Sequence, residues 1–234
     1  MGNTSGFTFD HIKLNGLTLK TIALVTMIVD HIGYIVFPHL IVLRIIGRIA
    51  FPIYAFLAAE GALHSRNIGK YLLRIFIFAA MSEPVFDLAF FGRLYYPDYQ
   101  NVFFTLGLGI AAIWLTEKPP AALSGIPVYL RGAAAGIIAC LAAWGLDSDY
   151  GAYGVIVIFI FYMFRDRLYI ALIGAELIFI AMGSIEWLAF LGLIPLLFYS
   201  GRRGYGGKPL QYLFYAAYPL HLLLIHFISV YTWR

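Results

Sequence analysis

Charge and cysteine are both scarce in this sequence of 234 residues. Only 12% of the residues are Asp, Glu, Lys or Arg, roughly half of the share that soluble domains carry, whereas 62% are hydrophobic. The single cysteine, Cys140, lies in an apolar run and allows no intramolecular disulfide and no thiolate metal site. The net charge of +4 comes from short loops between apolar runs, so we expect a lipid bilayer, and no nucleic acid, as the partner of this surface.

Several motifs that would indicate other kinds of protein are also missing. The sequence has no Gly-rich phosphate loop between a strand and a helix and no Gly-x-Ser-x-Gly turn. No helix carries two histidines at i,i+4 spacing, so no metal site is predicted. Internal repeats, low-complexity tracts and long linkers are absent, and residues 1–234 therefore form one predicted domain. The first apolar run is too long for a cleavable signal and contains Asp30 and His31, which indicates a retained transmembrane helix.

What the sequence does contain is a series of apolar runs. A membrane-spanning helix needs about 20 mainly apolar residues. Proline, glycine and polar residues divide the chain into runs of about that length, although the sixth and eighth are short. We therefore predict an all-α, polytopic bundle with about nine transmembrane helices, or eight if one short run does not span. The predicted segments are 18–38, 41–63, 70–91, 101–116, 128–145, 152–164, 168–183, 185–199 and 210–231.

The loop charges predict the orientation. If the N-terminus is cytosolic, the inner loops hold twelve Lys and Arg residues and the outer loops hold only two, Arg93 and Arg234. Positive residues concentrate in cytoplasmic loops of membrane proteins. We therefore expect a multi-pass protein of a bacterial plasma membrane, with a cytosolic N-terminus.

Ionisable side chains within the apolar runs are the main candidates for function. Each charge at the centre of a bilayer helix costs about 2.5–3.5 kcal/mol on translocon scales, unless it is paired or faces water. With the predicted orientation, these residues come from several helices and share the outer half of the membrane. Lys20 lies at the cytosolic end of the first helix, and His31 is about 16 Å further along it. The candidates are Asp30, His31, Arg44, Arg48, Glu83, Asp87, Asn101 and His221.

Helical spacing suggests how these groups are arranged. Arg44 and Arg48 are four residues apart, as are Glu83 and Asp87, so each pair shares a helix face. We expect the two arginines and the two carboxylates to neutralise each other, either as a structural ion-pair network or as part of a substrate site. Asp30 and His31 point about 100° apart, so another helix must orient the His31 ring.

For carboxylates elsewhere in the chain we expect structural roles or solvent exposure. Glu176 and Glu186 are isolated in the sequence, so we expect them to pack or to pair. Asp149 lies in a predicted loop, where solvation is the simpler interpretation.

The order of these polar motifs resembles the TraX family of membrane proteins over nearly the whole chain. The motifs include Asp30-His31, Ser82-Glu83-Pro84, Asp149-Tyr150-Gly151 and Tyr218-Pro219-Leu220-His221, with Arg44 and Arg48 between the first two. That family is named after a conjugation protein that acetylates the N-terminus of pilin. The chain also looks like a distant relative of the acyltransferase-3 membrane enzymes, whose first helix carries a basic residue and a histidine with ten residues between them, as Lys20 and His31 have.

The resemblance implies transfer of an acetyl group from cytosolic acetyl-CoA to an amine or hydroxyl acceptor, such as a protein N-terminus, a glycan or a small molecule. His31 would be the general base. Lys20, Arg48 and Asn101 would contact the donor, and the remaining candidates would stabilise charge or hold the site in position. Two alternatives stay open: a proton- or ion-coupled transporter, which also needs buried charges, and an assembly protein in which these charges only hold helices together.

Overall fold

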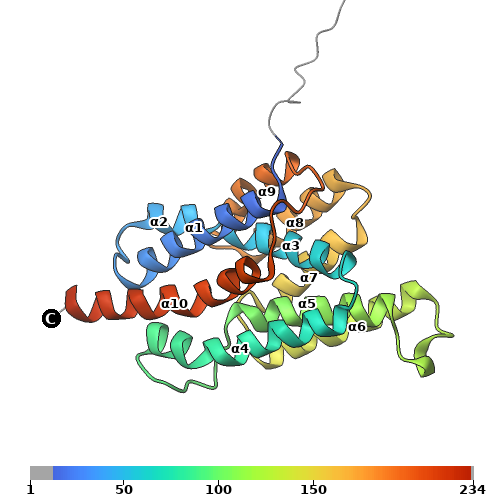
Figure 1. Cartoon of the computed structure of the whole chain (residues 1–234), viewed down its shortest axis with the longest axis horizontal. Coiled ribbons are helices and arrows are strands. Elements are labelled where there is room, and N and C mark those ends of the chain that lie inside the picture. Colours follow the sequence, from blue (N-terminus) through green and yellow to red (C-terminus); the bar gives the residue numbers. More distant parts are fainter. Residues whose placement is uncertain (1–12, 233–234) are drawn as a thin grey trace, which may run out of the picture.

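The structure, a computed structural model, describes residues 13–232 as helices joined by short loops (Figure 1). Two isolated bridges are the only extended pairings among these residues. The predicted all-α fold is confirmed. The elements are α1 (Gly16–Ile35), α2 (Ile41–Gly47), α3 (Ala50–Leu63), α4 (Ile68–Phe91), α5 (Val102–Glu117), η1 (Ala121–Leu123), α6 (Val128–Gly145), α7 (Gly151–Met163), α8 (Leu168–Met182), η2 (Glu186–Ala189), α9 (Phe190–Leu197) and α10 (Lys208–Thr232).

Each of the nine predicted segments coincides with helical structure, but two of them are divided. Segment 41–63 forms α2 and α3, and segment 185–199 forms η2 and α9. Pro52 explains the first break, because its ring would clash with the carbonyl four residues earlier, at Arg48, and it has no N–H to donate there. Arg48 therefore lies at a turn between two short helices instead of inside one long helix.

The helices have the dimensions of an integral membrane protein. Within the described part of the chain, four stretches are long and apolar enough to cross a bilayer, and four shorter apolar helices accompany them. The long stretches are Gly16–Ile35, Ile41–Leu63, Val128–Gly145 and Pro209–Thr232. Many large apolar side chains are exposed on the outside of the bundle, as expected where lipid is the solvent.

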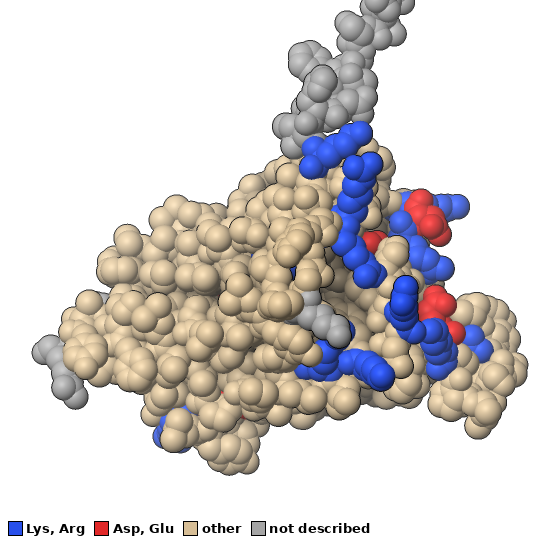
Figure 2. Space-filling model, in the orientation of Figure 1, with Lys and Arg blue, Asp and Glu red and all other residues tan. Residues whose placement is uncertain are grey.

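Lysine and arginine side chains gather on one side of the molecule (Figure 2). This is the side on which the α5–α6 and α7–α8 connections lie in Figure 1. These connections carry Lys118, Arg165 and Arg167, which the loop charges predict to lie on one side of the membrane. Of the two predicted outer cations, Arg93 follows α4, and Arg234 lies outside the described residues. The orientation relative to the cytosol stays a prediction.

A close approach between α1 and α2 positions the polar centre. A Cβ atom on Gly47 would lie 1.9 Å from the Asp30 carboxylate, and one on Gly33 would lie 2.6 Å from the Leu43 side chain. Both positions therefore require glycine if the two helices are to pack this closely. As a result, Asp30 on α1 lies directly against the turn that carries Arg48.

Candidate functional site

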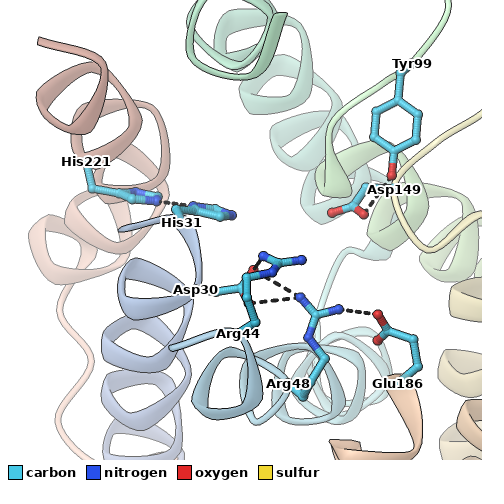
Figure 3. Close-up of polar contacts among 8 residues, drawn as sticks. All are labelled: Asp30, His31, Arg44, Arg48, Tyr99, Asp149, Glu186 and His221. Carbon is cyan, nitrogen blue, oxygen red and sulfur yellow. Dashed lines mark hydrogen bonds and ion pairs between the residues drawn. The ribbon is translucent and has the colours of Figure 1, made fainter. Parts of the chain in front are cut away.

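Two histidines from opposite ends of the sequence meet at the centre of the site (Figure 3). His31 lies on α1 and His221 on α10, with His31 Nδ1 and His221 Nε2 2.6 Å apart. Both rings are buried, with 9% and 8% of their surfaces exposed. The expectation that another helix orients the His31 ring is confirmed, and that helix is α10.

The hydrogen bonds fix the tautomers of the two rings when both are neutral. His221 Nδ1 lies 2.7 Å from the carbonyl of Ala217, and because a carbonyl can only accept, this nitrogen carries the proton. His221 Nε2 is then the acceptor, and His31 Nδ1 donates to it. His31 Nε2 is left without a proton, and in Figure 3 it points away from His221. The arrangement presents one basic nitrogen.

An ion-pair cluster lies beside these rings. Arg44 Nη1 donates to Asp30 Oδ2 at 2.5 Å, and Arg48 Nη2 donates to Asp30 Oδ1 and Oδ2 at 2.9 and 3.1 Å. Arg48 Nη1 also donates to Glu186, which opens η2. We call Asp30, Arg44, Arg48 and Glu186 the arginine cluster. Its two positive and two negative charges balance, which is the condition for keeping such groups in a bilayer.

The predicted pairing of these arginines with Glu83 and Asp87 was wrong. The close contact between α1 and α2 places Asp30 within reach of both guanidinium groups, so the arginines pair with Asp30 and not with the carboxylates of α4. The topology indicates how deep each of these residues lies in the membrane, but it does not indicate which neighbouring helix each side chain faces. Glu186, by contrast, pairs as expected for a buried carboxylate, although its partner could not be identified from sequence.

Glu83, Asp87 and Asn101 form a separate group, the amide cluster, where α4 meets α5. The Asn101 side chain caps α5 by accepting from the Phe103 N–H at 3.0 Å and donates to Glu83 and to the Ala79 carbonyl. The backbone N–H of Asn101 also donates to Glu83, at 3.1 Å, and Asp87 accepts from the Tyr96 N–H at 2.7 Å. These contacts hold the α4–α5 connection. The catalytic and donor-binding roles expected for this group stay predictions.

A further carboxylate, that of Asp149, lies across from the histidines and the arginine cluster in Figure 3. The Tyr99 hydroxyl donates to it at 3.0 Å. Burial raises the pKa of Asp149 to about 6, although the Tyr99 hydrogen bond and the nearby Arg48 charge act in the opposite direction. The simple expectation of a solvated loop therefore missed a partly enclosed group, and Tyr99 was not expected here at all. No spacing signal in the sequence links residues 99 and 149.

Lys20 lies on the same side of α1 as His31 but at the other end of the helix. Eleven residues correspond to three turns and about 20° of rotation, so the two side chains share a face. Lys20 is exposed and lies near the charge of Arg203, whereas His31 is buried. Leu24 and Met27 occupy the same face between them.

These features define a helical membrane protein with a buried histidine pair and a charge-balanced arginine cluster at one site. The profile of the TraX protein family matches residues 15–229, and the chain belongs to this family. It is 27% identical to "Probable fimbrial assembly protein FimC, serogroup H1" of Dichelobacter nodosus over 92% of this chain and 96% of that protein. A segment of 40 residues, 17% of this chain, is 52% identical to part of an uncharacterized protein of Rickettsia prowazekii (strain Madrid E), of which it covers 16%. No solved structure matches.

Proposed function

We propose that the protein is a membrane acetyltransferase that uses acetyl-CoA and acts on an amine or hydroxyl acceptor. The observation that carries this proposal is the hydrogen-bonded path from the Ala217 carbonyl through His221 to His31, which leaves one basic nitrogen beside a pair of arginines. Membership of the TraX family, whose name comes from a pilin-acetylating protein, supports the same chemistry.

His31 Nε2 is the general base. It takes a proton from the acceptor N–H or O–H while the acceptor atom forms a bond to the thioester carbonyl carbon. The carbon–sulfur bond then breaks, and the proton passes to the sulfur of the leaving CoA. His221 keeps the His31 ring in the required tautomer and orientation, so it is a positioning residue.

Arg44 is the better placed arginine for stabilising the oxyanion formed in this step. Only its Nη1 donates a hydrogen bond among the described residues, and its guanidinium lies over the Tyr34 ring, 4.9 Å from the centroid. Arg48 uses both terminal nitrogens on Asp30 and Glu186. Arg48 therefore holds the cluster together, and Arg44 has donors left for the reacting oxygen.

Lys20 and the other cations on the basic side would bind the CoA phosphates, with the pantetheine arm running towards His31 over about 16 Å of α1. The donor then enters from the cytosol, and the acceptor reacts at the outer side of a bacterial plasma membrane. The similarity to a probable fimbrial assembly protein supports a protein amine as one such acceptor.

The proposal is tested with purified protein in nanodiscs. Acetyl-CoA should raise the melting temperature, since ligands that bind the folded state stabilise it, and free CoA should be released over time. His31→Ala should abolish CoA release and keep the thermal shift. Full CoA release by His31→Ala would remove His31 as the base.

Two further variants separate positioning from donor binding. His221→Ala should lower CoA release by up to about 100-fold, because the His31 ring loses its anchor, without changing the thermal shift. Lys20→Ala should weaken the thermal shift and raise the apparent KM for acetyl-CoA. Proton flux in liposomes without CoA would instead favour the transporter.

A further inference from the structure

A groove lies on the outside of the bundle, between α8 and α9. It has a volume of about 300 Å³, and all but one of its lining residues are apolar. Several of these side chains are open to the surroundings; the exposed fractions are 63% for Ile173, 59% for Leu177 and 45% for Ile194. The groove therefore faces the lipid and belongs to neither the histidine pair nor the arginine cluster.

The exception in the lining is Glu176. It is the ninth residue of α8, far from either end of the helix. Its Oε2 atom is buried, and its side chain forms no hydrogen bond or ion pair within the described part of the chain. An uncompensated carboxylate at this depth costs about 2.5–3.5 kcal/mol or more, and such residues normally mark a functional contact. Glu176 was expected to pack or to pair. Its carboxylate packs, and among the described residues it has no partner.

A second copy of this chain is a poor partner for the groove. In a two-fold dimer the same surface meets itself, so one Glu176 would face the other. Among the cations within the described helices and their connecting turns, Arg44 and Arg48 are engaged with Asp30 inside the bundle, and the Nε of Arg74 on α4 is buried.

We propose that the groove between α8 and α9 is the docking site for a transmembrane helix of another protein that carries a lysine or arginine at mid-membrane, with Glu176 as its counter-ion. The apolar lining receives the side chains around that cation, and pairing offsets part of the cost of burying the two charges. Without a large hydrophobic driving force between helices in lipid, packing and polar contacts of this kind decide which helices associate. The inference does not depend on acetyl transfer.

The experiment uses synthetic transmembrane peptides as probes. The full chain in phosphatidylcholine nanodiscs is mixed with a 23-residue Leu/Ala helix that carries one central Lys, or with the same helix carrying Leu or Gln there. A fluorescent donor on the protein and an acceptor on the peptide report association. The Lys peptide should bind at least tenfold more tightly than the Leu peptide, and Glu176→Gln should remove that difference.

A relocation variant distinguishes the groove from a mere lipid-facing charge. Ile138 lies in the middle of α6 and is 62% exposed, so Ile138→Glu together with Glu176→Gln moves the carboxylate to an open helix face. This double variant should bind the Lys peptide no better than Glu176→Gln alone. Recovery of binding would overturn the role of the groove.

Three other outcomes would also overturn the proposal. Equal binding of the Lys and Gln peptides would mean that hydrogen bonding, not charge, is recognised. Equal binding of the Lys and Leu peptides would mean that the groove recognises no cation and is filled by lipid chains. Disulfide-linked dimers of an Ile194→Cys variant in a Cys140→Ala background, formed at the working concentration, would assign the groove to a second copy.

Discussion

The arginine cluster and the amide cluster contain carboxylates at the same end of the bundle, yet the protein holds them in different ways. In the arginine cluster, Asp30 and Glu186 meet two guanidinium groups contributed by another segment. In the amide cluster, Glu83 and Asp87 accept hydrogen bonds from an asparagine and from backbone N–H groups near their own helix. Carboxylates at a similar depth in the bundle therefore do not all belong to one site. The first cluster links three helical segments through charge, and the second fastens a connection.

The strongest test of this comparison removes the central charge of the arginine cluster. Arg48→Leu leaves Asp30 with Arg44 alone and Glu186 without a described ionic partner. Breaking a buried ion pair on one side typically costs about 3–5 kcal/mol, so we expect a loss of that size in the free energy of unfolding, measured by denaturation in mixed micelles. The double variant Arg48→Leu/Glu186→Leu should recover part of it. Wild-type stability of Arg48→Leu would show that the cluster does not hold the helices.

Asp149 allows an intermediate test, because a neutral tyrosine holds it close to the charge of Arg48. Its pKa rises from the ordinary 3.8 to about 6. The folded protein then binds this proton more tightly than the unfolded chain, so this residue's contribution makes the free energy of unfolding fall as the pH rises from about 4 to above 6.

The measurement is thermal stability against pH in detergent. Asp149→Asn should remove this part of the pH dependence, and Tyr99→Phe should steepen it, because that hydrogen bond favours the charged carboxylate. An Asp149→Asn profile identical to that of the wild type would contradict the assignment.

The smallest effect is expected in the amide cluster. Glu83→Gln keeps one oxygen that can accept from the backbone N–H of Asn101, and it removes the charge and the second oxygen, which accepts from the Asn101 side chain. We expect the loss of one hydrogen bond to lower the free energy of unfolding by about 1 kcal/mol and to leave the release of CoA unchanged. A loss of activity in a variant that keeps its stability would place Glu83 in the reaction and remove the distinction between the two clusters.

The fold was largely predictable because membrane helices are specified by runs of apolar residues, which can be read without knowing what they contact. The division of segment 41–63 was not predicted, although Pro52 was a visible signal for it. The loop charges likewise predicted which connections share a side of the molecule, and the α5–α6 and α7–α8 connections, which carry Lys118, Arg165 and Arg167, lie on one side in Figure 1.

The site was predictable only in part. The sequence indicated that His31 needs a partner from another helix, and His221 is that partner. It did not indicate the partners of the arginines, because helix spacing gives the shared face of two residues but not the neighbour that the face meets. Glu186 and Tyr99 join the site through tertiary contacts over 138 and 50 residues of sequence, for which local patterns contain no information.

Gly47 has a consequence beyond allowing two helices to pack closely. Asp30 lies where the first carbon of any larger side chain would stand, so even a single methyl group there would push the carboxylate away from the two guanidinium groups that it joins. The charge balance of the protein's interior thus depends on a position that contributes no charge and no hydrogen-bonding side chain. Gly47 has no side chain, yet the ion pairs of Asp30 require it as much as they require Arg48, the residue that follows it.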